Sequence, residues 1–387
     1  MSMSLKVSYL LGSLNRGGTE TLLLDVFRNA KQQNLDAIGL YRKIGALETD
    51  FKETKIPFYY LPTGKNILSY LFKLRKYFKQ NNITVAHAQQ PIDALYAYFA
   101  CVFTKISVVL TFHGYDFTED KTGFRILKFI IKRTTSNIYV SASQRDYYVE
   151  KYKLDLNKQF VIYNGISFDK LDAGISNKKY EKSESIQAEK VKSNQLKSEL
   201  GLSENVILLG TVGNFNKVRD QITICRFLKL LKEQEVNFHF VFVGKKIENT
   251  PELYDACIQY CEENKLMDSV SFLGSRSDVP QILRDLDCFI YSTDHDTFGI
   301  AVVEAMACAI PVIVNDWKVM TEITGNGKYA TLYKTKNEVD LLRVFMLFLL
   351  NIEAYQRNAN EAANFVRNKF SIENHILNLK MFYNDLK

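Results

Sequence analysis

Short apolar runs alternate with stretches of helical periodicity along almost the whole chain of 387 residues. Such alternation predicts parallel β-sheets with helices packed on both faces. The predicted strands of the first half are Lys6–Leu11, Ala37–Leu40, Phe58–Leu61, Val85–Ala88, Val108–Phe112, Asn137–Val140 and Phe160–Tyr163. Those of the second half are Val206–Val212, Phe238–Val243, Val270–Leu273, Cys288–Tyr291 and Pro311–Val314.

One stretch, Asp172 to Glu199, breaks this rhythm because it is rich in Lys, Ser, Glu and Asn and poor in apolar residues. A chain of this length also exceeds what one compact core usually contains. We therefore predict an α/β protein with two Rossmann-like domains, residues 1–168 and 203–350, whose parallel sheets face a central cleft. Residues 169–202 are predicted to form a linker with an insertion. The end, residues 351–387, is helical in pattern and is expected to pack back toward the first domain.

The cysteines argue against a metal site or a disulfide framework. All six lie in apolar stretches, and only Cys257 and Cys261 are close in sequence, without two further ligands at a zinc-binding spacing. Buried, reduced thiols in a cytoplasmic protein are the expected state, and no metal is predicted.

No secretory or membrane-spanning segment is expected. The first strand begins at Lys6, which leaves no room for a signal peptide before it. The most apolar window, Ile92 to Phe112, contains charged residues and ends in a β-branched run, so we interpret it as a helix that leads into a strand.

The positive charge is concentrated in the first half of the chain. Residues 1–164 contain 23 Lys and Arg against 13 Asp and Glu, although the net charge of the whole chain is only +7. The excess gathers in two aromatic, amphipathic stretches without carboxylates, Lys65 to Lys79 and Phe124 to Arg133. Such helices suit an anionic membrane surface, and the alternative is an ordinary solvated face over a core. No nucleic-acid-binding motif is present, so no nucleic-acid partner is expected.

The strongest chemical signal lies between Cys288 and Val314. A strand leads into a polar loop, and Phe298 and Gly299 then open a helix whose amide groups are predicted to bind a diphosphate. Glu304, inside that helix, is placed to accept the hydroxyls of a ribose. Asp296, in the loop, is placed to hold hydroxyls of a sugar.

This segment resembles the glycosyltransferases of the GT-B fold, particularly family 4. Their pattern has two acidic residues separated by seven, then Glu-Ala-Met-Ala and a Pro-Val-Ile strand. The match here runs through Glu304-Ala305-Met306-Ala307 and Pro311-Val312-Ile313. The sequence departs from the pattern at Asp296, which replaces a Glu, and at Ala309, which replaces a common Gly.

The resemblance extends to the first half of the chain. Gly17 and Gly18 match the family's Gly-Gly-x-Glu loop, and paired glycines let the backbone approach a ligand closely. His113 matches a histidine at a strand end, which implies a catalytic contact with the donor sugar or its phosphate. His87 also lies at a family-like position and is the candidate for an acceptor contact, whereas Ser141 and Asn164 are interpreted as scaffold.

The second half contains further donor-binding candidates by the same resemblance. Arg219 matches a family lysine that neutralises the donor diphosphate, and a guanidinium can bind phosphate through two donors. Asn214 stands where many members carry an arginine, and Lys217 is the candidate replacement. Gly274 and Arg276 lie in the loop expected to bracket the base. Thr297, Phe298, Gly299 and Glu304 complete the predicted donor site, with Asp296 and Glu304 also predicted to be catalytic.

The resemblance implies transfer of a sugar with retention of configuration from a nucleotide sugar, with no cofactor required. A UDP-sugar or GDP-sugar is the expected donor, and a saccharide or lipid-linked saccharide is the expected acceptor, in surface polysaccharide biosynthesis. Association with the inner face of the plasma membrane is a further expectation.

Two alternatives stay open at this stage. The first is a non-catalytic nucleotide-binding or membrane-docking protein of the same fold. The second is a metal-dependent transferase that uses Asp294 and Asp296 as a D-x-D pair. The absence of a G-x-G-x-x-G or Walker loop argues against a dehydrogenase and against a P-loop enzyme.

Overall fold

The computed structural model describes residues 5–116, 121–172 and 194–386, and it divides into two compact units. The first unit comprises Met1–Ile166 and Phe370–Lys387, and the second comprises Ser167–Lys369. The described part of the predicted linker, which contains α7 (Asp169–Asp172) and α8 (Gln195–Glu199), belongs to the second unit. The middle of that insertion, residues 173–193, lies outside the described residues.

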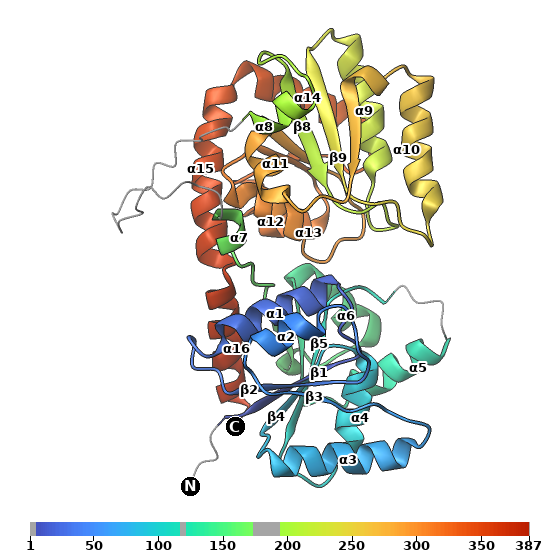
Figure 1. The fold of residues 1–387 in the computed structure, drawn as a ribbon, viewed down its shortest axis with the longest axis vertical. Helices are drawn as coiled ribbons and strands as arrows, with labels where there is room; N and C mark the ends of the chain where they lie inside the picture. Colours follow the sequence, from blue (N-terminus) through green and yellow to red (C-terminus); the bar gives the residue numbers. More distant parts are fainter. Residues whose placement is uncertain (1–4, 117–120, 173–193, 387) are drawn as a thin grey trace. The chain divides into compact units, whose positions relative to one another are not determined.

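The first unit is built on a seven-stranded parallel sheet with the order β3-β2-β1-β4-β5-β6-β7 (Figure 1). Its strands are β1 (Val7–Leu11), β2 (Ala37–Tyr41), β3 (Phe58–Tyr60), β4 (Val85–Ala88), β5 (Ser107–Phe112), β6 (Ser136–Tyr139) and β7 (Gln159–Val161). Every strand predicted for this half is therefore present, with ends shifted by no more than a few residues. Buried β-branched and aromatic runs of this kind leave little choice of conformation.

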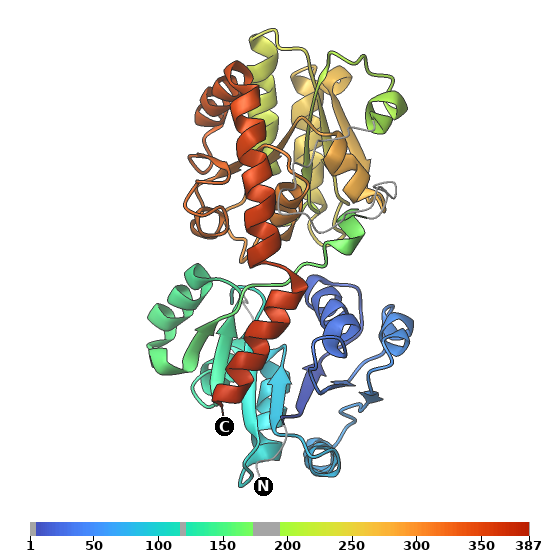
Figure 2. The same ribbon diagram turned by 90° about the vertical axis from the view of Figure 1, so that its left-hand side faces the viewer.

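Helices cover both faces of the first sheet. One core packs α1 (Gly18–Ala30), α2 (Glu48–Glu53) and α16 (Ile372–Asp385) against the sheet. The opposite core contains α3 (Ile67–Gln80), α4 (Pro91–Cys101), α5 (Lys121–Ile130) and α6 (Ala142–Tyr152). Figure 2 shows α16, from the far end of the chain, beside this sheet. Ile376 and Tyr383 of α16 are buried in the first core, which explains why the chain returns to this unit.

The second unit contains a six-stranded parallel sheet with the order β10-β9-β8-β11-β12-β13. Its strands are β8 (Ile207–Val212), β9 (Phe238–Val243), β10 (Val270–Gly274), β11 (Cys288–Tyr291), β12 (Val312–Asn315) and β13 (Thr331–Tyr333). The sequence analysis missed β13, a three-residue edge strand that pairs only with β12. Short edge strands carry too few residues to show a pattern.

Helices α9 (Gln221–Glu233), α10 (Pro251–Glu263) and α14 (Glu338–Leu350) pack on one side of the second sheet around a single core. The remaining helices of this unit are α11 (Val279–Asp285), α12 (Ile300–Ala307), α13 (Lys318–Ile323) and α15 (Ile352–Lys369). Of the two helices in residues 351–387, which were predicted to pack back toward the first domain, α15 belongs to this unit and α16 to the first unit.

The cysteines are free thiols, and all are buried except the half-buried Cys308. In the part of the chain that is described, no helix is long and apolar enough to cross a membrane. The window from Ile92 to Phe112 is a helix followed by a strand, α4 and β5, as predicted.

Candidate active site

The candidate site lies where the strand order of the second sheet reverses. β8 and β11 are neighbours in the sheet, although β9 and β10 separate them in sequence. The crossover connections after β8 and β11 leave in opposite directions, so a crevice is expected at the carboxyl ends of these two strands. The loop after β8 carries Arg219, and the loop after β11 carries Asp296.

Arg219, Asp296 and Tyr291 form one polar cluster in this crevice. Arg219 Nη1 donates to Asp296 Oδ2 at 2.9 Å, and the Tyr291 hydroxyl donates to the same oxygen at 2.5 Å. The Arg219 guanidinium also lies 4.4 Å from the centre of the Tyr291 ring. The guanidinium is therefore held from two directions, by a carboxylate and by an aromatic face.

The guanidinium of Arg219 is well placed to bind an anion. Burial lowers its pKa, and the carboxylate of Asp296 opposes that effect; an arginine nevertheless stays charged in proteins. Arg219 Nε is buried and has no hydrogen-bond partner among the described residues. A cation that is poorly hydrated and keeps an unused donor attracts phosphate strongly.

The carboxylate of Asp296 is already fully engaged. Besides Arg219 and Tyr291, its Oδ1 accepts the amides of Thr297 at 2.8 Å and Phe298 at 3.3 Å. The Phe298 amide, predicted to face a diphosphate, therefore donates to Asp296 instead. The short Asp side chain folds back on its own loop, and this geometry favours the positioning of Arg219 over a contact with sugar hydroxyls.

Main-chain contacts fix the two loops against each other. The Asp220 amide donates to the Ser292 carbonyl at 3.1 Å, and Ser292 Oγ donates to Asp220 Oδ2 at 2.9 Å. Trp317 Nε1 donates to the Asp296 carbonyl at 3.1 Å. These contacts hold the two loops together, and the ion pair between Arg219 and Asp296 joins their side chains.

Helix α12 begins immediately after this loop. Its N-cap, Gly299, has a φ of 82°, and a Cβ at this position would lie 2.7 Å from Met320 Cε. The left-handed backbone favours glycine here, and a larger residue would also have to displace the tip of the Met320 side chain. The first amides of α12 have no acceptor within the helix. Glu304, one turn further along, is half-buried.

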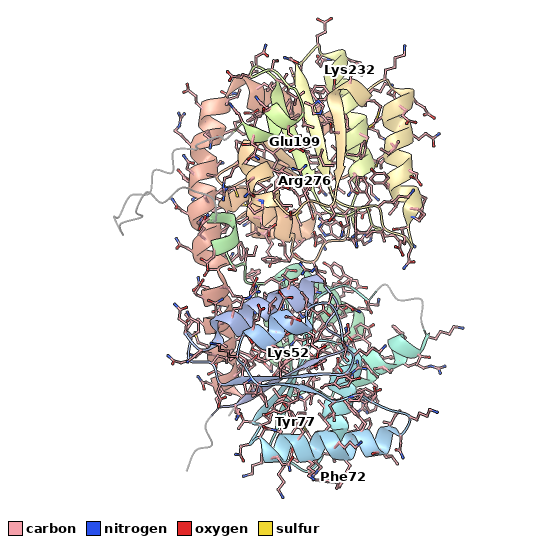
Figure 3. The ribbon with its side chains drawn as sticks, in the orientation of Figure 1. Lys52, Phe72, Tyr77, Glu199, Lys232 and Arg276 are labelled. Atoms are coloured by element: carbon pink, nitrogen blue, oxygen red, sulfur yellow. The ribbon has the colours of Figure 1, made fainter. Side chains whose placement is uncertain are left out.

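Two of the other predicted donor residues of this unit, Asn214 and Arg276, have partners within the protein. Asn214 Oδ1 accepts the Lys245 amide at 3.1 Å, while Lys217 is exposed. Arg276 binds Glu199 at 2.6 Å and Asp278 at 2.6 Å, and Figure 3 labels it with Glu199 near α8. Arg276 therefore ties α8 to the loop that begins at Gly274, and a contact with the base would have to use the loop backbone.

The D-x-D pair is divided between separate partners. Asp294 binds Lys336 Nζ at 2.5 Å and His295 Nδ1 at 2.6 Å, whereas Asp296 binds Arg219. Within residues 5–116, 121–172 and 194–386, no group of three His, Cys, Asp or Glu side chains could hold a metal ion. This arrangement favours charge neutralisation by protein cations over a shared divalent ion.

In the first unit, the predicted glycine loop caps α1. Gly17 is the N-cap and Gly18 is the first helical residue, exposed and with open space around the position of a Cβ. A Cβ on Gly17 would lie 2.6 Å from Glu20 Oε2, so the Glu20 side chain folds back over the loop. Burial raises the pKa of Glu20.

Three histidines surround one small internal cavity of about 10 Å³ in the first unit, room for one water molecule at most. His113 Nε2 lies 2.8 Å from Gln89 Oε1, and His375 Nδ1 lies 2.7 Å from the Tyr163 carbonyl. Burial lowers the pKa of His113 and His375 to about 4 and that of His87 to about 3. All three are therefore neutral at pH 7.

His87 is a core residue. It is 2% exposed, and its two ring nitrogens lie 2.6 Å from the Tyr383 and Thr111 hydroxyls. This position does not suit the predicted acceptor contact. Ser141 caps α6 through the Gln144 amide at 3.2 Å, in keeping with its interpretation as scaffold.

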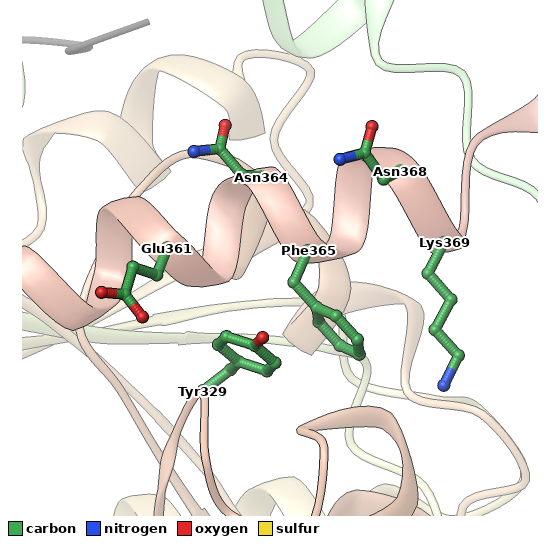
Figure 4. A pocket seen from close by; sticks show the side chains of 6 residues that line it. All are labelled: Tyr329, Glu361, Asn364, Phe365, Asn368 and Lys369. Carbon is green, nitrogen blue, oxygen red and sulfur yellow. The ribbon is translucent and has the colours of Figure 1, made fainter. Parts of the chain in front are cut away.

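Three further residues of these clusters, Tyr291, Trp317 and His375, carry no signal in the sequence pattern. Tyr291 ends a predicted strand, so only the pairing of β8 with β11 reveals its role beside Arg219. A surface hollow along α15, about 530 Å³, shares no residue with the Arg219 cluster. Figure 4 shows its lining, in which the Tyr329 ring stacks on Phe365 with centroids 4.3 Å apart.

Comparisons with known proteins agree with this geometry. Residues 16–170 match the model of Glycosyltransferase Family 4, and residues 192–365 match that of Glycosyl transferases group 1. The chain is 25% identical to N-acetyl-alpha-D-glucosaminyl L-malate synthase of Bacillus anthracis, over 81% of this chain and 78% of that protein. It is 24% identical to UDP-Gal:alpha-D-GlcNAc-diphosphoundecaprenol alpha-1,3-galactosyltransferase of Escherichia coli, over 87% and 82% of the two chains.

Among solved structures, Anabaena Alr3699/HepE in complex with UDP superimposes with a TM-score of 0.82 at 18% identity, over 98% of this chain and all of that one. The two matched family models together cover most of the chain. The chain belongs to the family 4 glycosyltransferases and has the two-domain GT-B fold. It is therefore a transferase enzyme and not a non-catalytic protein of the same fold.

Proposed function

We propose that this enzyme transfers a sugar from a nucleotide sugar to a saccharide acceptor with retention of configuration, and that Arg219 binds the donor diphosphate. The observation that carries this proposal is the cluster of Arg219, Asp296 and Tyr291 at the strand reversal, directly before α12. A buried guanidinium beside the start of a helix suits a diphosphate.

In the proposed reaction the bond between the sugar C1 and the diphosphate oxygen breaks, and a bond from C1 to the acceptor oxygen forms on the same face. The acceptor proton passes to an oxygen of the departing diphosphate, so no carboxylate base is needed. Arg219 stabilises the charge that develops on the leaving group. Asp296 positions Arg219, Glu304 accepts the ribose hydroxyls, and His113 contacts the sugar or its phosphate as a neutral imidazole.

For the donor we favour a UDP-sugar, and for the acceptor a lipid-linked saccharide in surface polysaccharide synthesis. Anabaena HepE was solved with UDP and with UDP-glucose, which supports uridine as the base. The Escherichia coli relative uses a UDP-galactose donor and an acceptor on diphosphoundecaprenol. An enzyme acting on such acceptors would work peripherally at the cytoplasmic face of the membrane.

Donor binding tests the proposal through thermal shifts of the full chain with UDP-, GDP- and ADP-glucose, each with and without a chelator. We expect the UDP-sugar to raise the unfolding temperature in both conditions, since a ligand at a hundred times its Kd stabilises by about 2.7 kcal/mol. Glu304→Gln should weaken this binding about tenfold, because a charged hydrogen bond to ribose is lost.

The matched control is Glu361→Gln, an exposed change on α15 that should leave donor binding unaltered. A shift that appears only with divalent ions would favour the Asp294 and Asp296 pair as a metal site. The absence of any shift with all three donors would contradict the proposed donor class.

A further inference from the structure

The first unit presents large apolar side chains to solvent on α3 and after α4. Leu68 and Phe72 of α3 are 78% and 72% exposed, and Phe103, in the turn after α4, is 99% exposed. Figure 3 shows Phe72 pointing outward from α3. A few isolated exposed apolar residues are ordinary, but a group this large on one face indicates an interaction surface.

The helical spacing of α3 separates this group from the core. Tyr70, Leu74 and Phe78 recur every four residues and are buried. Leu68, Phe72 and Lys76 follow the same spacing on the opposite side and are exposed. The apolar pair at the start of α3 therefore continues directly into a basic stripe.

Phe103 is unusual for its backbone as well as for its exposure. It has a φ of 60° at the end of α4, in the left-handed region where glycine or asparagine is the ordinary choice. Arg75 of α3 donates to the carbonyls of Ala100 at 3.1 Å and Val102 at 2.6 Å. Those two bonds hold the Phe103 turn beside α3, so Phe72 and Phe103 belong to one surface.

The same surface extends to α5. The rings of Phe99 and Phe129 stack with centroids 6.1 Å apart, and the Arg133 guanidinium lies 3.7 Å from the centre of the Phe129 ring. We name the exposed residues of α3, the α4 end and α5 the basic aromatic face. Its members are Lys65, Ile67, Leu68, Phe72, Lys73, Arg75, Lys76, Lys79, Phe99, Phe103, Lys105, Phe124, Arg125, Lys128, Lys132 and Arg133.

Carboxylates are few in the sequence around this face. Between Glu53 and Asp116 the chain has one acidic residue, Asp93, and Asp116, Glu119 and Asp120 directly precede α5. Asp93 is 3% exposed and binds Arg42 at 2.6 Å, so it does not offset the charge of the face. Lysines and arginines therefore outnumber carboxylates around the exposed aromatic and aliphatic side chains.

We propose that the basic aromatic face docks the enzyme onto an anionic lipid bilayer. Leu68, Phe72 and Phe103 enter the boundary between headgroups and acyl chains, while the surrounding lysines and arginines contact anionic headgroups. Both elements match a bilayer, because stable attachment of a peripheral protein takes an apolar and an electrostatic contribution together. A second copy of the chain is a poorer partner, since a symmetric dimer on this face would place like charges opposite one another.

This inference deepens the proposed function, because a lipid-linked acceptor would be reached from such a surface. Docking can be absent while the proposed transfer reaction still occurs, because flotation measures docking without turnover. The experiment is flotation of the full chain with vesicles of phosphatidylglycerol and phosphatidylcholine, compared with phosphatidylcholine alone. We expect flotation with the anionic vesicles only, weakened at least tenfold by high salt.

Two variants distinguish the apolar and electrostatic contributions. Phe72→Ser with Phe103→Asn should reduce partitioning at least tenfold without loss of folding, because both side chains are exposed and asparagine tolerates the backbone at position 103. Lys76→Glu with Lys79→Glu should reduce it similarly and should flatten the salt dependence.

The matched controls change similar residues elsewhere and should float like the unaltered chain. They are Leu350→Ser, which removes an exposed leucine of α14's end, and Lys31→Glu, which reverses an exposed charge after α1. Absence of flotation by the unaltered chain would overturn the proposal, as would flotation of both face variants to the same extent as the unaltered chain. The proposal would also be overturned if the unaltered chain did not float but formed a dimer or a nucleic-acid complex. In that case the face variants, and not the control variants, would disrupt the dimer or complex.

Discussion

Replacing Arg219 by alanine is expected to lower kcat/KM by a factor of about 10² to 10⁴, or roughly 3–5 kcal/mol of transition-state stabilisation. The physical reason is twofold. The departing diphosphate loses its buried cation, and Asp296 keeps a carboxylate in the crevice without its 2.9 Å partner. Steady-state kinetics with a saturating acceptor measures this loss.

Arg219→Lys should recover only part of the activity. A lysine retains the charge but cannot donate to Asp296 and a phosphate through one planar group, or stack on Tyr291 as the guanidinium does. The matched control is Lys217→Ala, in the same loop but exposed, for which a much smaller loss is expected. A kcat/KM of the Arg219→Ala enzyme within threefold of that of the unaltered enzyme would contradict the assignment of Arg219 to the diphosphate site.

The first unit is expected to lose stability steeply as the pH falls below 6.5. His87, His113 and His375 have pKa values of about 3, 4 and 4 in the folded chain, against about 6.5 in an unfolded one. Above pH 6.5 all are neutral in both states and this stability is fully present. Below it the unfolded chain binds protons first, so each histidine costs about 1.4 kcal/mol per pH unit until the folded pKa is approached.

Urea unfolding between pH 7.5 and 5 measures how steeply the free energy of unfolding falls with pH. Most carboxylates titrate below this range and therefore contribute little to the slope. Far-ultraviolet circular dichroism follows both units, and fluorescence of Trp317, the single tryptophan, reports the second unit separately. His87→Gln should reduce the slope of the first unit by about one third. An unfolding free energy that is flat over this range, or a slope unchanged by that substitution, would contradict three buried neutral histidines.

The sequence predicted most of the fold because the strands of these sheets are buried on both faces. Runs such as Phe238–Val243 can hardly form anything else, and β9 has those same bounds. β13 was missed because three residues at a sheet edge carry no periodicity. The short helix α8 was missed because its partners, Asp285 and Arg276, lie far along the chain and only the folded unit brings them to it.

The candidate site was predicted in its residues but less well in their contacts. Arg219 and Asp296 were both singled out, yet their mutual ion pair was not, although the reversal of strand order between β8 and β11 is the signal that could have revealed it. No pattern in the sequence places His375 beside His87 and His113, since α16 reaches the first unit from the far end of the chain.

The central claim is transfer from a nucleotide sugar with retention, through the diphosphate site at Arg219. Its most direct test is the anomeric configuration of the product, determined by proton nuclear magnetic resonance after reaction of a UDP-α-sugar with a saccharide acceptor. The account predicts an α-linked product that the Arg219→Ala enzyme forms far more slowly. A β-linked product, or an α-linked product formed equally well without Arg219, would contradict it.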